Sequence, residues 1–184
     1  MKTLNKIALA SLLGLALSAN AAVLKTDPAK STVSATFKQM NVPIESKFKK
    51  FTATIDYDAA KPDASKATVE VDTGSLDMGD ADYNKEVAKK EWFNAAQYPK
   101  ATFVSSAIKS AGAGKLNVTG KLTIKGKTTD VSFPLTVKTE AGKQVFDGVL
   151  PIKRLAYNIG EGEWKDTSIV ADDVTIKFHV VAGQ

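Results

Sequence analysis

The stretch KLNVTGKLTIKGKTTDVSFPLTV, residues 115–137, contains two runs in which every second residue is apolar. The apolar positions are Leu116, Val118, Leu122 and Ile124 in the first run and Val131, Phe133, Leu135 and Val137 in the second. Alternation with a period of two is typical of strands that bury one face. A Gly-Lys pair separates the runs, so the stretch predicts a β-hairpin with one apolar side. That side must be covered by a second sheet or by the interior of a closed barrel.

The same alternation recurs along the chain, with Gly, Pro or Asp residues between the runs. It predicts eight strands, at about residues 32–39, 48–57, 66–72, 101–108, 115–124, 127–138, 144–152 and 172–182. One segment, from about Ala81 to Trp92, has a helical pattern, with Asp80 or Asp82 as its N-cap. Many short strands with one short helix predict an all-β fold, an antiparallel sandwich or barrel.

One face of these strands is apolar and the other is mostly polar. Closing eight strands into a barrel leaves an interior that side chains either fill or line around one small ligand. Ala53 and Gly120 lie on the apolar parity, and small residues there are expected to leave room. On periodicity alone, a packed core remains the alternative.

The beginning of the chain has the pattern of a secretory signal. Two lysines precede a short apolar segment, Ile7 to Leu17, which is followed by Ala19-Asn20-Ala21. A signal peptidase reads small residues at the outer two of these three positions, and the apolar segment is too short to span a bilayer. We therefore predict a signal peptide over residues 1–21, one domain over residues 22–184, and export to the periplasm.

The amino-acid composition excludes several classes of function. The chain has no cysteine, which excludes thiolate chemistry, Cys-ligated zinc, iron–sulfur clusters and covalent haem attachment. The formal charge of +5 falls by two when Lys2 and Lys6 leave with the signal peptide, and the remaining lysines are scattered. Scattered positive charge serves solubility, so we expect no nucleic-acid partner.

Few residues have the pattern of a catalytic site. His179 is the only histidine and lies on the outward parity of the last strand, which argues against a catalytic triad or a histidine metal site inside a barrel. The remaining candidates are the loop carboxylates Asp77, Asp80, Asp82, Glu161 and Glu163. Gly-Asp-rich loops more often serve as turns and helix caps than as catalytic or calcium sites. We expect no enzyme activity, no metal site and no cofactor.

Four segments, taken in order, resemble the YceI-like family of exported bacterial proteins. They are FKKFTATIDYD (residues 48–58), KEWFNAAQYPKATFVSS (90–106), KLTIKGKTTDVSFPLTV (121–137) and IKRLAYNIGEGEWKDTSIVADDVTIKF (152–178). The resemblance implies an eight-stranded antiparallel lipocalin-like barrel with one short helix. It also implies an elongated apolar pore that holds a long amphiphile, for which a polyisoprenoid such as a quinone tail is the usual candidate.

The sequence departs from the family at the end of the first strand. Many members carry a histidine there, where this chain has Gln39 or Met40. An amide donates and accepts hydrogen bonds, but it does not titrate near neutral pH and is a poor metal ligand. We expect this subgroup, which lacks the first-strand histidine, to hold a neutral head group or to hold none firmly.

The predicted ligand-binding residues come from two places, the inward-facing positions of the strands and the polar loops at the pore mouth. They are Phe37, Gln39, Phe51, Ile55, Phe103, Val118, Leu122, Val131, Phe133, Leu135, Phe146, Arg154, Trp164, Ile176 and Phe178. Arg154 has two alternative roles, contact with a head group or pairing with a loop carboxylate.

The predicted partners are a long-chain isoprenoid or another lipid and, transiently, a membrane; the oligomeric state is left open. Two other functions remain as alternatives. One is an interaction protein of a membrane redox or envelope-stress system with a packed barrel, and the other is a carboxylate-based hydrolase.

Overall fold

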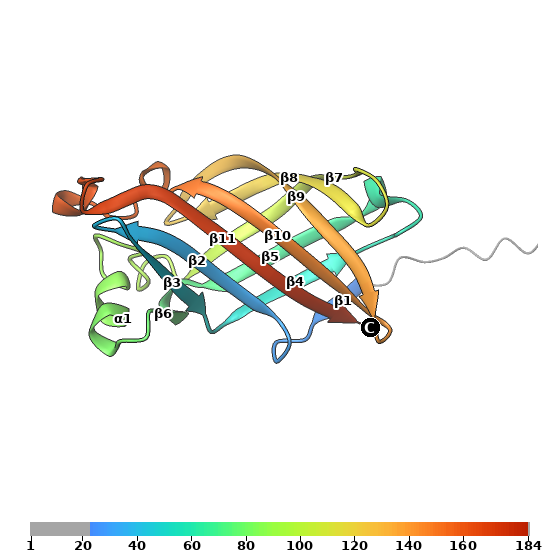
Figure 1. The fold of residues 1–184 in the computed structure, drawn as a ribbon, viewed down its shortest axis with the longest axis horizontal. Coiled ribbons are helices and arrows are strands. Elements are labelled where there is room, and N and C mark those ends of the chain that lie inside the picture. Colours follow the sequence, from blue (N-terminus) through green and yellow to red (C-terminus); the bar gives the residue numbers. More distant parts are fainter. Residues whose placement is uncertain (1–22, 184) are drawn as a thin grey trace, which may run out of the picture.

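The computed structural model describes residues 23–183, which form a closed antiparallel β-barrel with a short helix at one end (Figure 1). The predicted signal peptide over residues 1–21, with a mature chain beginning at Ala22, lies outside the described residues. Within the part of the chain that the structure describes, no helix is long and apolar enough to cross a membrane.

The barrel is built from strand segments and short helical turns. The strand segments are β1 (Val23–Thr26), β2 (Thr32–Gln39), β3 (Val42–Phe48), β4 (Phe51–Asp56), β5 (Lys66–Asp72), β6 (Leu76–Asp77), β7 (Lys100–Ser110), β8 (Lys115–Ile124), β9 (Lys127–Glu140), β10 (Lys143–Lys153) and β11 (Val170–Gly183). The helix is α1 (Ala81–Val87), and the 3-10 turns are η1 (Pro62–Ala64), η2 (Thr73–Ser75), η3 (Arg154–Tyr157) and η4 (Gly162–Lys165).

The barrel closes because the short strand β1 pairs on both sides. Lys25 lies opposite Thr54 of β4 and opposite Gly183 of β11. Three of the barrel strands are each made of two consecutive segments, which are β1 with β2, β3 with β4, and β5 with β6. The strand segments therefore make eight barrel strands, and the predicted eight-stranded antiparallel barrel with one short helix is confirmed.

The hairpin of residues 115–137 forms as its alternation predicts. β8 pairs with β9 so that Val118 lies opposite Phe133, and both side chains face the barrel interior. The turn consists of Lys125 and Gly126 rather than of the predicted Gly-Lys pair, because Lys127 already begins β9; the two turn residues have φ angles of +48° and +73°. Positive φ at both central residues is the requirement of a type I′ turn, whose twist matches that of the flanking strands.

The alternating pattern did not predict segment β3, because a polar residue occupies one of its inward positions. Ser46 is only 1% exposed, and its hydroxyl donates a hydrogen bond to the carbonyl oxygen of Ala35 at 3.2 Å. The predicted strand over residues 48–57 begins at the last residue of β3, so its start was wrong.

Helix α1 begins where predicted but ends at Val87 rather than at Trp92. Its N-cap is Asp80, whose carboxylate accepts hydrogen bonds from the backbone N–H groups of Asp82 and Tyr83. Beyond Val87 the chain turns, because the N–H of Phe93 donates to the carbonyl of Val87. This turn places Trp92 and Phe93 against the core cluster of the barrel instead of on a helix surface.

Aromatic rings cover two glycines of the barrel wall. A Cβ at Gly120 would lie 2.6 Å from the ring of Phe103, and one at Gly148 would clash with the ring of Phe178. The expectation that Gly120 leaves room for a ligand is therefore wrong, because Phe103 on the neighbouring strand β7 occupies that room. Ala53, in contrast, does border the cavity described below.

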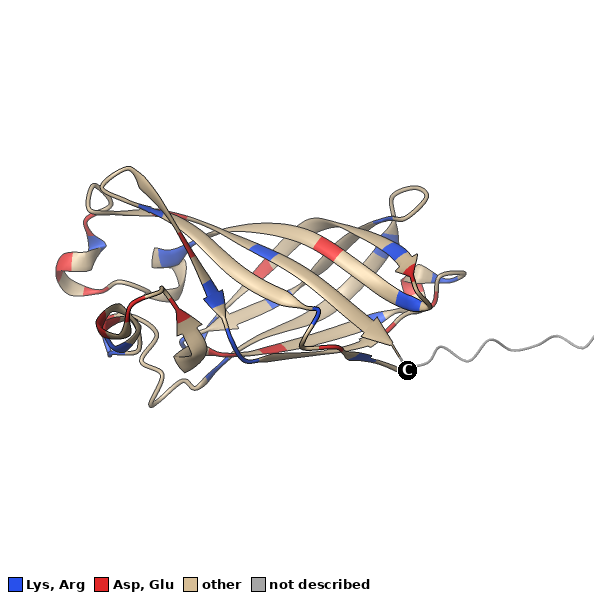
Figure 2. Cartoon of the chain, turned by 60° about the horizontal axis from the view of Figure 1, so that its bottom comes forward, with Lys and Arg blue, Asp and Glu red and all other residues tan. Residues whose placement is uncertain are grey.

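Charged residues are interspersed over the barrel rather than gathered. Figure 2 shows Lys and Arg positions alternating with Asp and Glu positions along the strands and at both ends. Several form cross-strand ion pairs, such as Lys121 with Asp130 at 3.0 Å and Lys100 with Glu70 at 2.5 Å. This is the scattered distribution that the sequence predicts.

Candidate functional site

The interior of the barrel holds an apolar cavity of about 280 Å³. A single buried water needs only about 10–15 Å³ of such space, and close-packed protein cores contain few voids larger than that. The interior therefore holds more space than a close-packed core, which favours a hollow barrel over the packed-core alternative. The cavity runs from Phe146 and Val180, near the C-terminal end of β11, to Trp92 and Trp164 at the opposite end.

Most of the predicted ligand-binding residues lie together on the wall of this cavity. Those on the wall are Phe37, Gln39, Ile55, Phe103, Val118, Leu122, Phe133, Leu135, Phe146, Arg154, Trp164, Ile176 and Phe178. Phe51 and Val131 instead pack against the core cluster without bordering the cavity. Contact of any of these side chains with a ligand stays a prediction.

Aromatic side chains pack against one another along the wall of the cavity. The rings of Phe103 and Phe133 lie 5.5 Å apart, and those of Phe133 and Phe178 are also 5.5 Å apart. Near the C-terminal end, Tyr57 packs edge-on against Phe146 at 5.5 Å. Aromatic pairs at such separations are mutually stabilising, so the cavity has a rigid, apolar lining along its length.

The other end of the barrel carries the mouth of the cavity. Helix α1 and the loop that contains η3 and η4 lie there, at the left of Figure 1 and away from the C-terminus. Tyr83 of α1 borders the cavity although 57% of its surface is exposed. The cavity therefore reaches the surface beside α1, and Trp92 and Trp164, with ring centroids 5.3 Å apart, lie next to this opening.

Arg154 is a buried cation at the mouth, with only 2% of its surface exposed. A guanidinium has five N–H donors, and here the nitrogens donate to backbone carbonyls alone. The acceptors are Ala171 at 3.1 Å, Ile159 at 2.8 Å, Gly160 at 3.3 Å, Trp164 at 2.6 Å and Val170 at 2.6 Å.

These contacts match neither of the two predicted roles of Arg154. Its donors are used by backbone carbonyls of the loop and of β11, so none is free for a head group. No carboxylate in the described part of the chain forms an ion pair with it, and its pKa is lowered by burial, partly offset by the more distant charge of Asp172. Arg154 therefore shapes the loop that carries η3 and η4, and it does so through carbonyl oxygens rather than through a carboxylate partner.

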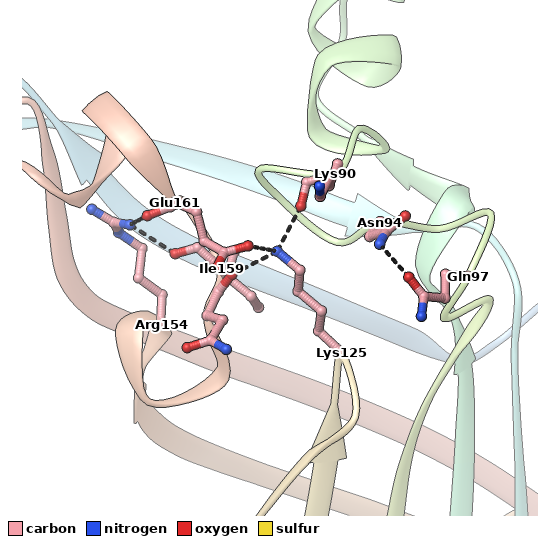
Figure 3. A network of polar contacts seen from close by, with 9 residues as sticks. Lys90, Asn94, Gln97, Lys125, Arg154, Ile159 and Glu161 are labelled. Carbon is pink, nitrogen blue, oxygen red and sulfur yellow. Dashed lines mark hydrogen bonds and ion pairs between the residues drawn. The ribbon is translucent and has the colours of Figure 1, made fainter.

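Lys125 is a second buried cation of the mouth, and its side chain is 6% exposed. Its Nζ donates to the carbonyls of Lys90 at 2.7 Å and Asn158 at 2.8 Å, and to the carboxylate of Glu161 at 2.8 Å (Figure 3). The hydrogen bond from Lys125 lowers the pKa of Glu161. One lysine thus ties the β8–β9 turn to the loop after α1 and to the loop before β11.

The loop carboxylates considered for catalysis have structural roles. Asp77 pairs with Lys49 at 2.8 Å and accepts a hydrogen bond from Asn84, and these contacts hold its pKa well below the usual range. Asp82 pairs with Lys85 on α1. Asp80 caps α1 and Glu161 binds Lys125, as described above, while Glu163 is exposed. The structure does not bring these carboxylates together at the cavity.

His179 faces away from the cavity, as predicted. Its Nδ1 lies 2.6 Å from the carboxylate of Asp147 on the neighbouring strand β10, while the residues on either side of it, Phe178 and Val180, border the interior. The pair lies in a shallow depression on the outer face of the barrel.

Residues of the mouth that were missed from the sequence include Tyr83, Trp92 and Lys125. Tyr83 and Trp92 were assigned to a longer helix, and Lys125 was given no role. The only available signal was the Trp92-Phe93 pair, an apolar pair directly after a polar helix.

Comparison with known proteins places this barrel among described relatives. The profile of the YceI-like domain matches residues 24–182. The UPF0312 protein of Pseudomonas syringae pv. syringae (strain B728a) is 41% identical over 105 residues, which are 57% of this chain and 54% of that protein. The chain thus spans about half the length of the curated relatives it matches.

Solved structures agree with the barrel fold. The crystal structure of Burkholderia cenocepacia BcnA is 60% identical, with a TM-score of 0.84, and the match covers 86% of this chain and 99% of that chain. A polyisoprenoid binding domain from Saccharophagus degradans, implicated in plant cell wall breakdown, is 17% identical with a TM-score of 0.71, covering 86% of this chain and 97% of that chain. At that identity the second likeness concerns the fold alone.

Proposed function

The chain belongs to the YceI-like domain family, as its motifs predict, and on this premise we propose that its barrel binds a long apolar amphiphile. We place the tail in the interior cavity, with a polyisoprenoid of the quinone-tail type as the ligand, and we assign the protein to the periplasm. The observation that carries the proposal is the elongated apolar cavity of about 280 Å³, open beside α1.

The physical basis is burial of the tail. Each methylene removed from water contributes about 0.8 kcal/mol, and this gain is offset in part by ordering the flexible chain. The wall consists almost entirely of aliphatic and aromatic side chains, and the guanidinium at its mouth, that of Arg154, has its donors occupied. Such a wall accepts an uncharged tail and discriminates against a charged group deep in the barrel.

Two further observations support the proposal. The Saccharophagus degradans domain with the same fold is described as polyisoprenoid binding. The pattern of residues 1–21 supports export, and an exported carrier would meet membrane lipids on leaving the cytoplasm. The proposal is one of binding without catalysis, because four of the five loop carboxylates that would serve a hydrolase are engaged: Asp77, Asp82 and Glu161 in ion pairs and Asp80 in a helix cap.

The direct test is to purify the protein from its natural export compartment, extract it with organic solvent and analyse the extract by mass spectrometry. We expect one dominant long-chain lipid in near-stoichiometric amount. A parallel preparation of Leu122→Gln, which places an amide on the cavity wall, should carry less of that lipid. Val149→Gln is the matched control, because Val149 lies on the outer face and is 45% exposed. A parent protein that carries no lipid and takes up none from vesicles would contradict the proposal.

A further inference from the structure

Three of the large apolar side chains that the structure leaves exposed lie at the mouth of the barrel. They are Met40 and Val42 on the β2–β3 hairpin, which are 72% and 57% exposed, and Tyr83 on α1, which is 57% exposed. The hairpin turn and α1 lie at the same end of the barrel, at the left of Figure 1. Exposed Val104 and Val149, in contrast, lie within the long strands β7 and β10. We call Met40, Val42 and Tyr83 the apolar rim.

The apolar rim is continuous with the wall of the cavity. Val42 lies opposite Gln39 in the pairing of β2 with β3, and Gln39 borders the cavity. Tyr83 borders the cavity itself. The backbone N–H of Met40 donates to the carbonyl oxygen of Ile169 at 2.8 Å, which fixes the hairpin tip to the loop before β11. Whatever covers the apolar rim would therefore lie next to the opening of the cavity.

Neither the turn nor the core of the protein explains Met40. Met40 and Asn41 have φ angles of +48° and +64°, the geometry of a type I′ turn, in which Asn, Asp and Gly are the preferred residues. Positive φ disfavours a long apolar side chain, and a side chain that is 72% exposed gains little from burial in the barrel. Residues held against their local preference are concentrated at functional sites.

The charges beside the apolar rim do not favour a charged partner. Lys85 pairs with Asp82 on α1 at 3.0 Å, and directly after the helix Lys89 pairs with Glu86. Figure 2 shows residues of both signs at this end of the barrel. Positive and negative charges thus compensate locally, and the exposed apolar side chains remain the feature that selects a partner.

We infer that the apolar rim docks the mouth of the barrel onto a lipid bilayer. Met40 and Val42 enter the boundary between head groups and acyl chains, and the Tyr83 ring lies at the level of the head groups, where amphipathic rings are enriched. This inference rests on the proposed function and adds the route of exchange. A ligand tail passes from the bilayer into the cavity without crossing water, whereas a protein seated on the apolar rim would lie across the opening.

The double variant Met40→Asn, Val42→Thr removes two apolar side chains of the rim without disturbing the hairpin. Asparagine tolerates positive φ better than methionine, and threonine, like valine, suits a strand. The unfolding midpoint in urea should therefore equal or exceed that of the parent protein. Flotation of lipid-stripped protein with phosphatidylcholine vesicles measures the partition coefficient. We expect it to fall by at least about 10-fold, because the apolar area of two side chains is no longer buried in the bilayer.

The double variant Val104→Thr, Val149→Thr is the matched control. It also removes two exposed apolar side chains, which are 50% and 45% exposed, but takes them from strands outside the apolar rim. Its partition coefficient should equal that of the parent protein. Because the charges beside the rim compensate, partition of the parent should change little with salt or with the fraction of phosphatidylglycerol in the vesicles.

A fluorescent label shows which end of the barrel meets the bilayer. The chain has no cysteine, so a single introduced cysteine carries the environment-sensitive nitrobenzoxadiazole dye. Asn41→Cys places the dye at the tip of the β2–β3 hairpin. Ala141→Cys places it in the β9–β10 turn at the opposite end, at an exposed residue that also has a positive φ, of +47°. With phosphatidylcholine vesicles, only the dye at residue 41 should shift to shorter wavelength and gain intensity.

The outcomes separate this inference from the proposed function. Equal partition of the rim variant and the parent protein, or an equal response of the two labels, overturns the docking and leaves lipid binding intact. A response of the residue-41 label to native membranes that pure lipid vesicles do not reproduce assigns the rim to a protein partner and also overturns it. A parent protein that floats with vesicles but takes up no lipid overturns the proposed function and the route of exchange with it. Partition that depends on the rim, together with a shift at residue 41 alone, supports the docking.

Discussion

The ammonium group of Lys125 lies 2.8 Å from the carboxylate of Glu161, although the two residues are 36 positions apart. The contact joins the tip of the β8–β9 hairpin to the loop before β11, and it is the sole ion pair of Lys125 among the described residues. Because both segments border the mouth of the cavity, this pair links the stability of the mouth to the charge of one carboxylate.

The mouth should loosen in acid because of Glu161. Its pKa is lowered from the ordinary value of 4.5, first by the hydrogen bond from Lys125 and then by the charges of Lys125, Lys165 and Lys90. A carboxylate whose pKa is lowered on folding stabilises the fold above its ordinary pKa, and this contribution is lost as the pH falls through the lowered value. We expect the protection factors of the Ile159 and Gly160 amides, which compare their exchange with that of an unstructured amide at the same pH, to fall below about pH 4.5.

The variant Glu161→Gln separates this effect from general acid unfolding. The variant removes the titrating carboxylate. The amides of Ile159 and Gly160 should therefore be less protected from exchange already at neutral pH, and their protection should change less as the pH is lowered. Glu163→Gln, at an exposed neighbouring position, should behave like the parent protein. Equal acid sensitivity in the parent and in Glu161→Gln would mean that the Lys125–Glu161 pair does not govern the mouth.

Arg154→Lys should destabilise the protein although the charge is kept. A lysine has three donors at one point and cannot reach carbonyls spread over the η3–η4 loop and β11. Several buried carbonyls would lose their partners, so we expect a loss of about 3 kcal/mol or more in the free energy of unfolding. Urea denaturation measures it, with Lys153→Arg on the surface as the control. A loss below 1 kcal/mol would show that water replaces the guanidinium.

Leu122→Gln tests whether the cavity is a binding site. Leu122 borders the cavity, so its amide would face a hollow rather than a close-packed neighbour. We expect a modest loss of about 1–2 kcal/mol in folding free energy, below the 2–5 kcal/mol typical of a disrupted packed core, and a larger loss of affinity for a fluorescent long-chain amphiphile. Thermal unfolding of lipid-stripped protein beside a binding titration compares the two. A severe loss of stability, with no saturable binding by the parent protein, would favour a packed barrel.

Gly120→Ala should weaken the barrel wall. The new methyl group would lie 2.6 Å from the Phe103 ring and would clash with the backbone oxygen of Val104, which cannot move away. Overpacking of this kind costs about 1–3 kcal/mol. Gly74→Ala is the control, because its nearest neighbour would lie at an ordinary 3.4 Å. Equal stability of the two variants in urea would contradict the close approach of Phe103 to β8.

His179→Ala should leave ligand binding intact. The side chain pairs with Asp147 on the outer face and does not border the cavity. The affinity for a long-chain amphiphile is measured alongside the unfolding midpoint, with Thr175→Ala on the same outward parity of β11 as the control. A loss of affinity in the folded His179→Ala variant would reverse the assignment of faces on β11.

The strands were predictable because their rule is local. Alternation along β8 and β9 assigns Val118 and Phe133 to one face, but it left a sandwich and a barrel as alternatives, and only the family resemblance favoured the barrel. The prediction of strands from alternation failed in β3, where the polar residue Ser46 occupies an inward position. The predicted end of helix α1 was wrong because the helix ends in a backbone turn at Phe93, and no stop residue marks that turn in the sequence.

The sequence by itself therefore determined most of the strands, their inward faces, the family and a part of the cavity wall. The tertiary structure alone decided how the mouth is held and which apolar side chains are exposed there. The partners of Arg154 and Lys125 are mainly backbone carbonyls, which every residue carries, so no side-chain pattern marks them in the sequence. The exposure of Met40 and Tyr83 is likewise defined by what does not lie beside them, and that depends on how distant segments pack together.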